Sequence, residues 1–210
     1  MIENKERIGN FTSSQIYNLC AVNKDGNYSS AYYTYISKKI RERKLKRSLD
    51  MGKYGASMAW GKFLEKRVND NLPFGYQMLH KTTKLHPKFN YVSGSVDFLV
   101  PGVKVAELKC YEPDKFSSYV SALLTNDLQQ IKSEFPQEYW QMVSNSQIHK
   151  TPKMEAIVYM PYESEMEEIR QLADDPEYLN SIGMMPWEVR FITEKQIGRA
   201  SCRERVSSPV

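Results

Sequence analysis

Two acidic residues and a lysine stand close together in the segment Gly94–Lys109, GSVDFLVPGVKVAELK. Asp97 falls in one stretch typical of a strand, and Glu107 and Lys109 fall in the next. Because Glu107 and Lys109 are two residues apart, both side chains leave the same face of that strand. Carboxylates suit Mg²⁺, and a bound cation makes a water nucleophilic and neutralises charge on a phosphate. The pattern therefore predicts metal-assisted hydrolysis of a phosphodiester, with the amine holding the water or the phosphate.

The turn between these strands decides whether the two carboxylates share a face. A two-residue loop at residues 101–102 would pair Asp97 with Ala106 and turn Glu107 to the opposite face. We therefore expect a three-residue loop or a one-residue bulge in this hairpin, since bulges are common beside active sites. The alternative is that the Glu-x-Lys motif supplies only solvated residues on an exposed strand face.

Two predicted helices carry further polar residues. In Gly61-Lys62-Phe63-Leu64-Glu65, an acidic residue stands on a helix that is otherwise lined by apolar positions. In the helix that opens with Glu138-Tyr139-Trp140-Gln141, Gln141 and Asn145 form one polar strip at i and i+4. The alternatives are an ordinary surface glutamate in the first helix and simple amphipathicity in the second.

Taken in order, Gly-x-x-x-Glu, Gly-x-x-Asp, Glu-x-Lys and the Tyr-Trp-Gln helix resemble the phage-lambda-type exonucleases (YqaJ-like viral recombinases) of the PD-(D/E)xK nuclease superfamily. The opening FTSSQIYNL and the strand EAIVYM are also similar. The resemblance covers about Ile8 to Gln196. It departs at Val96 and Val143, where many members have Pro and Gln. It implies an α/β (α+β) fold, with a restriction-endonuclease-like mixed β-sheet flanked by helices.

The resemblance also implies a role for each matched residue. Asp97 and Glu107 would bind Mg²⁺, or Mn²⁺ in its place, together with the main-chain carbonyl of Leu108. Glu65 would complete the metal site, directly or through water. Lys109 would orient the attacking water and steady the phosphate. These residues, with Gln141 in support, would form the catalytic site.

Nucleic-acid contacts are expected from two other segments. Ser13 or Ser14, at the start of a predicted helix, is placed to bind a phosphate, because helix N-termini attract anions. A run of seven basic residues within ten positions offers DNA contacts, each of which would add to the salt dependence of binding. The alternative is a solvated helix face. The run comprises Lys38, Lys39, Arg41, Arg43, Lys44, Lys46 and Arg47.

In function, the resemblance implies an Mg²⁺-dependent exonuclease that degrades duplex DNA from its ends, 5′→3′, during phage-type recombination. The implied partners are double-stranded DNA ends, a single-strand annealing protein and further copies of the chain in a homo-oligomer. No membrane is involved, and the implied location is the cytoplasm of a bacterial host. The alternatives are a related endonuclease or a nuclease of other polarity, and a catalytically inactive DNA-binding or structural module of the same fold.

Composition sets the frame for these predictions. The chain has 210 residues, of which 41% are hydrophobic and 26% charged, with a formal net charge of +4. These values predict one globular domain that needs no disulfide or structural metal to fold. No apolar run approaches the ~20 residues of a membrane span. The polar N-terminus is unlike a secretory signal, and three unclustered cysteines fit a reducing compartment.

The last residues are expected not to be native. Ile197–Val206, IGRASCRERV, back-translates to a widely used DNA sequencing adapter. We therefore expect a single nuclease domain over residues 1–196 and an adapter-derived tail over 197–210, with a natural basic tail as the alternative. The tail carries +2 of the net charge, which leaves the remaining chain at +2.

The elements that must position these residues follow from hydrophobic periodicity. Helices are predicted from Thr12 onward and over Ala31–Leu49, Gly52–Asn71, Leu123–Ile131, Pro136–Ile148 and Glu163–Ala173. Strands are predicted over Tyr76–Leu85, Tyr91–Val100, Val103–Cys110, Glu155–Met160 and Trp187–Thr193. This order favours one domain built on a mixed sheet.

Overall fold

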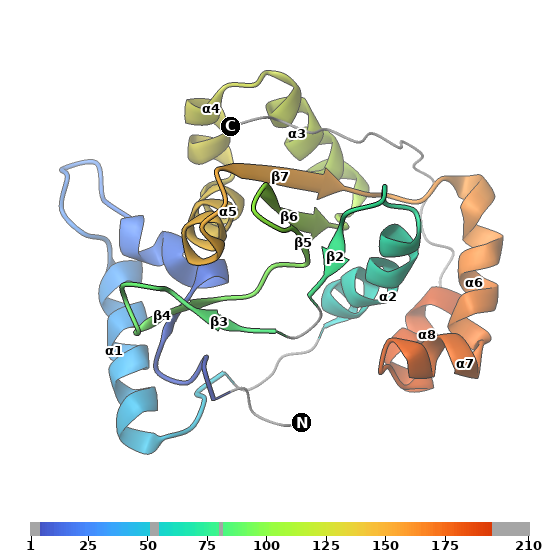
Figure 1. The fold of residues 1–210 in the computed structure, drawn as a ribbon, viewed down its shortest axis with the longest axis horizontal. Helices are drawn as coiled ribbons and strands as arrows, with labels where there is room; N and C mark the ends of the chain where they lie inside the picture. Colours follow the sequence, from blue (N-terminus) through green and yellow to red (C-terminus); the bar gives the residue numbers. More distant parts are fainter. Residues whose placement is uncertain (1–4, 51–54, 80–81, 195–210) are drawn as a thin grey trace.

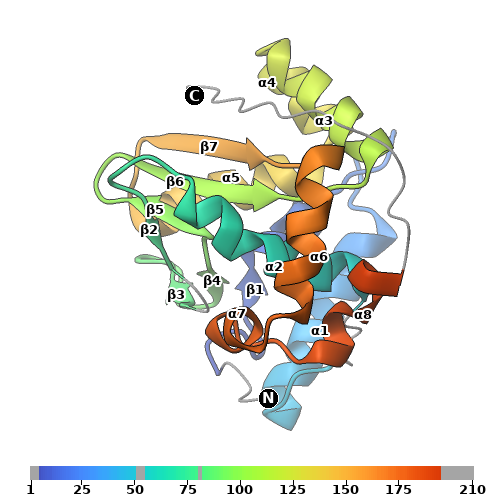
Figure 2. The same cartoon turned by 90° about the vertical axis from the view of Figure 1, so that its right-hand side faces the viewer.

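Two small mixed sheets lie at the centre of the chain, with helices around them (Figures 1 and 2). The computed structural model describes residues 5–50, 55–79 and 82–194. The predicted fold class, a mixed sheet flanked by helices, is confirmed. The predicted tail over residues 197–210 lies outside the described residues. No helix in the described ranges is long and apolar enough to cross a membrane.

The larger sheet has four strands in the order β2-β5-β6-β7. Strand β5 pairs antiparallel with β6, and β6 pairs in parallel with β7. The β6–β7 connection contains helices, as parallel neighbours require. The four strands are β2 (Gln77–Met78), β5 (Phe98–Val100), β6 (Lys104–Lys109) and β7 (Lys153–Val158).

The β5–β6 hairpin has the loop that the sequence predicts. Val100 pairs with Lys104, so three residues, 101–103, form the loop. Gly102 takes the left-handed conformation within it (φ +71°), a conformation for which glycine lacks the steric penalty. Phe98 pairs with Ala106, and continuing this register by one residue sets Asp97 opposite Glu107. The two carboxylates therefore share a face.

The smaller sheet, β1-β4-β3, divides two of the predicted strands. It consists of β1 (Phe11–Thr12), β4 (Val92–Gly94) and β3 (Lys84–Leu85). The predicted strand Tyr91–Val100 is therefore two short strands, β4 and β5, that belong to different sheets. The predicted strand Tyr76–Leu85 is likewise split into β2 and β3, and its residues 80–81 lie outside the described residues. The chain leaves the smaller sheet after Gly94 and enters the larger one at Phe98.

Helices cover both faces of the larger sheet and form two hydrophobic cores. On one face, Phe63, Phe98 and Ile169 join a core shared by α2, β5 and α6–α8. On the other face, Tyr119, Met142 and further residues form a core shared by α3–α5 and β7. The helices are α1 (Ser30–Leu45), α2 (Ala56–Asp70), α3 (Pro113–Leu124), α4 (Leu128–Glu134), α5 (Pro136–His149), α6 (Met166–Asp174), α7 (Pro176–Ser181) and α8 (Pro186–Glu194).

Two predicted elements are wrong in type or extent. The predicted strand Trp187–Thr193 is the helix α8, in which Val189 and Ile192 are buried one turn apart while Trp187 is exposed. The predicted helix Leu123–Ile131 spans the break between α3 and α4. Asp127 starts α4 because its carboxylate accepts bonds from two amides of the first turn.

The helix predicted from Thr12 is a 3-10 helix, η1 (Ser13–Cys20). Thr12 occupies the N-cap position, and its side chain makes no capping hydrogen bond. A short 3-10 segment, η2 (Glu163–Glu165), opens the acidic helix α6. Of α3 only Leu123 and Leu124 fall within a predicted helix, and α7 was not predicted.

Candidate active site and phosphate pocket

Asp97 and Glu107 meet where the hairpin β5–β6 approaches α5. The backbone N–H of Leu108 donates a 2.7 Å hydrogen bond to Oδ2 of Asp97. This bond holds the Asp97 carboxylate beside β6, on the face that also carries Glu107. Glu107 is only 2% exposed, so the alternative that it is a solvated strand residue is wrong.

Helix α5 supplies two amides to Glu107. Gln141 Nε2 donates to one carboxylate oxygen at 2.7 Å, and Asn145 Nδ2 donates to the other. Gln141 Oε1 in turn accepts a 3.0 Å bond from Lys109 Nζ, which lies 3.8 Å from Glu107 Oε2. The polar strip of α5 therefore faces the sheet, and Gln141 joins the acidic and basic members of the Glu-x-Lys motif.

Electrostatics at this cluster favour an added positive charge. Burial raises the pKa of Glu107 well above its usual range, and the neighbouring negative charge of Asp97 raises it further. The charge of Lys109 and the bond from Asn145 act in the opposite direction. Two carboxylates thus share a site with one nearby ammonium group. A divalent cation would relieve the repulsion between them.

Glu65 lies on α2, on the other side of β6 from α5. Burial raises the pKa of the Cys110 thiol, and the charges of Asp97 and Glu65 both raise it further. Both charges act on Cys110, the residue that follows the end of β6. Among the residues that the structure describes, no three His, Cys, Asp or Glu side chains group closely enough to hold a metal ion. The structure therefore brings Asp97, Glu107, Lys109 and Gln141 together, and the place of Glu65 in the metal site stays a prediction.

The donor set at the hairpin fits Mg²⁺ better than a transition metal. Mg²⁺ in nuclease-type sites is typically held by one or two carboxylates and keeps several waters. Asp97 and Glu107 supply two carboxylates, whose oxygen atoms are the ligands that this cation prefers. Their roles as metal ligands, and those of Leu108 and Glu65, stay predictions.

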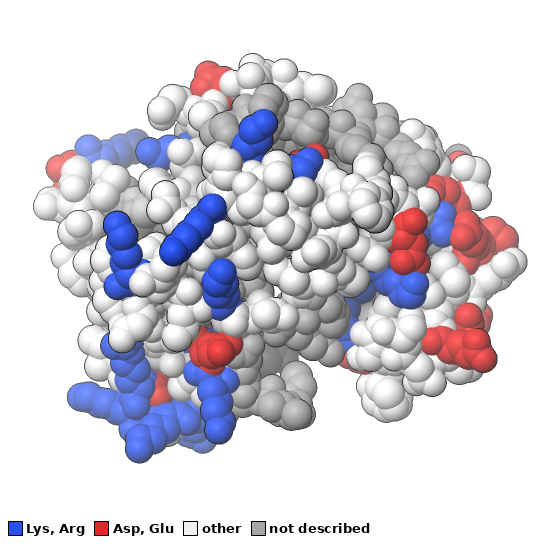
Figure 3. All heavy atoms as spheres, in the orientation of Figure 1, with Lys and Arg blue, Asp and Glu red and all other residues white. Residues whose placement is uncertain are grey.

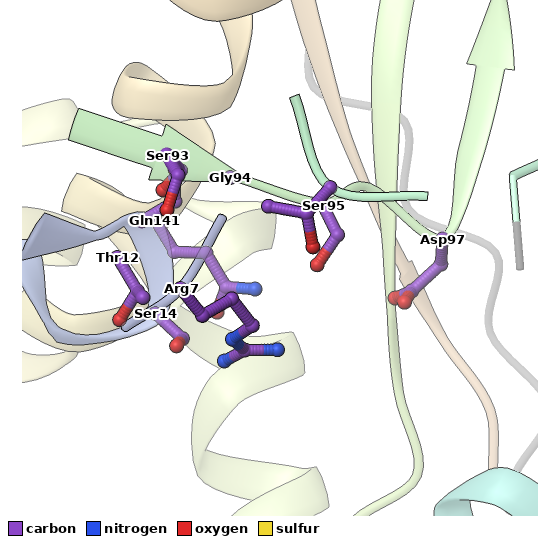
Figure 4. A pocket seen from close by; sticks show the side chains of 10 residues that line it. Arg7, Thr12, Ser14, Ser93, Gly94, Ser95, Asp97 and Gln141 are labelled. Atoms are coloured by element: carbon purple, nitrogen blue, oxygen red, sulfur yellow. The ribbon is translucent and has the colours of Figure 1, made fainter. Parts of the chain in front are cut away.

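A pocket of about 170 Å³ opens beside this cluster. Figure 4 shows the side chains of Arg7 and Gln141 ending near each other, with Ser14 on one side and Ser95 and Asp97 on the other. Because Asp97 and Gln141 belong both to the pocket and to the carboxylate cluster, the two form one continuous site. The lining residues are Arg7, Thr12, Ser13, Ser14, Thr83, Ser93, Gly94, Ser95, Asp97 and Gln141.

The pocket is built to receive an anion. Six of its lining residues carry hydroxyl groups, and Arg7 adds a guanidinium group. The N-terminus of η1 also opens there, with backbone N–H groups that have no partner within the helix. Ser93 is fully buried, and its hydroxyl has no hydrogen-bond partner among the described residues. Buried hydroxyl groups ordinarily have a hydrogen-bond partner, which can be a water or a bound anion.

The predicted phosphate contacts Ser13 and Ser14 thus lie in the same pocket as Asp97. Ser13 is buried, and its hydroxyl lies 2.8 Å from that of Ser144 on α5. Sequence reasoning missed Arg7 and the serines on either side of Gly94. The only signal for the latter was their position just before Asp97, and for Arg7 there was none.

The basic run on α1 divides into structural and exposed members. Lys39 is 5% exposed and is paired with Glu42, so the prediction that it contacts DNA is wrong. Lys38 is paired with Asp50, and Arg43 donates to the backbone of Gly9. Arg41 is exposed. Even so, Lys and Arg side chains gather over the end of α1, opposite the acidic surface of α6 and α7 (Figure 3).

The tyrosines beside this run differ in burial and in their ring contacts. Tyr35 is buried in α1, as core packing predicts, whereas Tyr33 is exposed. The ring of Tyr32 stacks on that of Tyr28 at 4.0 Å between centroids. The described contacts of Tyr32 are therefore with neighbouring tyrosines.

Comparison with known proteins identifies the fold. The chain is similar to the structure of an alkaline exonuclease (LHK-Exo) from Laribacter hongkongensis, with 17% identity, a TM-score of 0.57, and coverage of 89% of this chain and 92% of that one. A structure of LHK-Exo in complex with dAMP is similar at 16% identity, a TM-score of 0.56, and coverage of 90% and 93%. A phage-related exonuclease from Haemophilus somnus 129PT has 12% identity, a TM-score of 0.50, and coverage of 88% and 93%.

No protein-family model matches the chain, and the comparison with curated proteins gave no match. The structural similarities extend over nearly the whole of each chain. The chain therefore has the fold of these exonucleases, as its sequence motifs led us to expect.

Proposed function

We propose that this protein is a metal-dependent deoxyribonuclease that hydrolyses phosphodiester bonds from the ends of duplex DNA. One observation carries the proposal. The carboxylates of Asp97 and Glu107, with Lys109, adjoin an anion pocket lined by hydroxyl groups and Arg7. The fold similarity to exonucleases supports the same conclusion. Burial raises the pKa of Glu107 and the facing carboxylate of Asp97 raises it further, an arrangement for which a purely structural module would have no need.

Each residue of the cluster has a distinct task in this proposal. Asp97 and Glu107, with the Leu108 carbonyl and Glu65 through water, would hold Mg²⁺, or Mn²⁺ in its place. When bound, the cation would lower the pKa of a water and neutralise charge on the scissile phosphate. Lys109 would hold that phosphate and orient the attacking water. No residue of the chain would form a covalent intermediate.

Gln141 would hold Glu107 and Lys109 in fixed positions relative to each other. Its amide donates to Glu107 and accepts from Lys109, so one side chain sets the separation of the two. Since an amide cannot change charge, it orients both groups over a wide pH range. Hydrogen bonds of this kind, from residues that do not touch the metal, orient the side chains that bind it.

The pocket explains why we propose attack at ends. A phosphate at the 5′ terminus would carry one more negative charge than an internal phosphodiester. Arg7 would offset that charge, and the six hydroxyl residues would donate hydrogen bonds to the phosphate oxygens. With the terminal phosphate held there, the next phosphodiester along the strand would reach Asp97, which borders the pocket. This arrangement favours 5′→3′ polarity over the opposite one.

The test is degradation of linear duplex DNA in Mg²⁺. We expect the wild-type protein to release nucleotides from a 5′-labelled strand, and EDTA to stop the reaction. Glu107→Ala and Lys109→Ala should abolish it. Digestion that persists unchanged in both variants would refute the assignment.

Two further substrates separate the alternatives. Closed circular duplex DNA should resist the enzyme, and its cleavage would indicate an endonuclease. Binding of linear DNA without any cleavage, in either Mg²⁺ or Mn²⁺, would indicate the inactive DNA-binding module. A role in phage recombination, an annealing-protein partner, a homo-oligomer and a cytoplasmic location stay predictions from the sequence resemblance.

A further inference from the structure

Helix α1 turns an unusually polar face toward the rest of the protein. Its buried residues are Tyr35, Lys39 and Glu42, of which two are charged. Core-facing helix surfaces are ordinarily apolar, and Lys and Glu are seldom fully buried unless paired. This face therefore serves something other than hydrophobic packing. Glu42 and Tyr35 on this face accept hydrogen bonds from the backbone N–H groups of Gly9 and Thr12.

One residue of that segment is held by both of its backbone groups. The N–H of Gly9 donates to Glu42 Oε2 at 3.0 Å. The carbonyl oxygen of Gly9 accepts a 2.8 Å bond from Arg43 Nε. Gly9 has a φ of +68°, and a Cβ there would lie 2.2 Å from Arg43 Cγ. Only glycine can occupy this position without displacing the side chain that holds it.

A third contact lies three residues after Gly9. The N–H of Thr12 donates a 2.9 Å bond to the hydroxyl of Tyr35. Tyr35 and Glu42 are seven residues apart, so they lie on one face of α1. Three backbone groups of the segment are thus fixed by side chains of a single helix.

The charges in this contact are balanced internally. Lys39 Nζ donates to Glu42 Oε2 at 2.9 Å, and Glu42 Oε1 accepts from the N–H of Leu49 at 3.1 Å. The Glu42 carboxylate therefore accepts hydrogen bonds from three donors, the N–H of Gly9, Lys39 Nζ and the N–H of Leu49. Replacing a buried ion pair by apolar residues is often neutral or stabilising, so we attribute this pair to the position it imposes on Gly9 rather than to stability.

The segment that α1 holds is the one that supplies the pocket. Arg7 precedes Gly9 by two residues, and Thr12, Ser13 and Ser14 follow it, and all four line the pocket. A change at Gly9 would move Arg7 relative to the serines of η1. We propose that Glu42 and Arg43 are positioning residues, which set the phosphate pocket and so determine the preference for a phosphorylated DNA end. This inference rests on the proposed function.

A matched pair of variants tests the inference. Arg43→Gln and Arg41→Gln each remove one positive charge from α1, but only Arg43 contacts Gly9. The substrates are identical duplexes that carry either a 5′-phosphate or a 5′-hydroxyl group. We expect Arg43→Gln and Glu42→Gln to lower the ratio of kcat/KM on the 5′-phosphate duplex to kcat/KM on the 5′-hydroxyl duplex by at least about fivefold. The change should lie in KM for the phosphorylated end, with kcat on the 5′-hydroxyl duplex retained.

Arg41→Gln should raise KM for both ends equally and keep their ratio, because a distant charge acts on any DNA. Arg43→Lys, which keeps the charge and one donor, should restore part of the ratio. An unchanged ratio in folded Arg43→Gln, or an equal loss in Arg41→Gln, would overturn the inference. Arg43 is exposed, so this variant carries the test if Glu42→Gln does not fold.

Binding without turnover separates this inference from the proposed function. In EDTA, the wild-type protein should bind a fluorescein-labelled duplex more tightly when its 5′ end is phosphorylated, and Arg43→Gln should lose that difference. If the wild-type protein shows the binding preference but no cleavage in Mg²⁺ or Mn²⁺, the nuclease assignment fails and the pocket stands. If it cleaves DNA but never distinguishes the two ends, the positioning role fails instead.

Discussion

The side-chain amide of Gln141 donates a 2.7 Å hydrogen bond to Glu107, a residue 34 positions away in the chain. The bond connects α5 to the middle of β6. Since the same amide accepts from Lys109 at 3.0 Å, one neutral residue links two charged ones. The arrangement has direct consequences for catalysis by the proposed nuclease.

Removing this amide should impair activity without unfolding the protein. We expect Gln141→Leu to lower kcat by about 10- to 100-fold, the usual cost of losing a residue that supports a metal ligand. Gln147→Leu, on the exposed side of the same helix, is the matched control and should change kcat less than twofold. Steady-state rates on linear duplex DNA measure both. Equal rates for the two variants would remove Gln141 from the site.

Replacing the lysine of the cluster should affect the chemical step more than DNA binding. We expect Lys109→Met to reduce kcat by about 10²- to 10³-fold, because the ammonium group would act on charge that develops at the phosphate. Lys153→Met, at an exposed position at the start of β7, should leave kcat almost unchanged. Binding of duplex DNA in EDTA should be similar in both variants. A Lys109→Met protein that loses binding and keeps kcat would contradict this role.

Gly94 should be intolerant of any side chain. A Cβ at this position would lie 2.2 Å from Asn145 Oδ1 and from Ser13 Oγ, and 2.8 Å from Ile148 Cδ1. We expect Gly94→Ala to lower the free energy of unfolding by roughly 1–3 kcal/mol, because η1 and α5 must both move.

Gly61 provides the opposite case. A Cβ there meets no atom within 4 Å, and the residue lies inside α2. Gly61→Ala should therefore raise the free energy of unfolding by roughly 0.5–1 kcal/mol, through helix propensity. Urea denaturation measures the free energy of unfolding of both variants. A Gly94→Ala protein as stable as the wild type would contradict the close packing of Gly94 against η1 and α5.

Acid should weaken the contact between α1 and Gly9. Burial raises the pKa of Glu42, but bonds from Lys39 and from the amides of Leu49 and Gly9 outweigh it and hold the pKa below the ordinary value of 4.5. A lowered pKa in the folded state stabilises the protein above the unfolded pKa, and this contribution is lost as the pH falls through the folded value. The stability difference between wild type and Glu42→Gln should therefore be constant from about pH 6 to 8 and shrink below about pH 4.5. Thermal unfolding at a series of pH values checks it, and a difference that grows in acid would reverse the sign of this argument.

The carboxylate pair could be predicted because strand alternation and loop length together determine the register. Asp97 and Glu107 share a face only with a three-residue loop, and that loop is present. The α5 strip was predicted for the same kind of reason, since Gln141 and Asn145 are one helical turn apart. Both cases depend on short-range geometry that sequence spacing encodes.

The pocket could not be predicted in this way. Its hydroxyl groups come from the η1 start, Thr83 and the β4 end, which tertiary folding brings together. The polar face of α1 likewise has no apolar periodicity, so Lys39 was interpreted as a surface charge. In α8, the alternation of Trp187, Val189 and Phe191 favours a strand, but burial of Val189 with Ile192 selects a helix.

The length of the loop at residues 101–103 has an evolutionary consequence. If the turn keeps three residues, adding or deleting one codon there would shift the pairing of β5 with β6 by a single step, so that Ala106 and not Glu107 would share a face with Asp97. Descendants of this gene should therefore conserve the number of these three residues and the glycine at position 102, whose φ of +71° other residues rarely adopt. Insertions that survive selection would be of even length, because only those return every side chain to its original side.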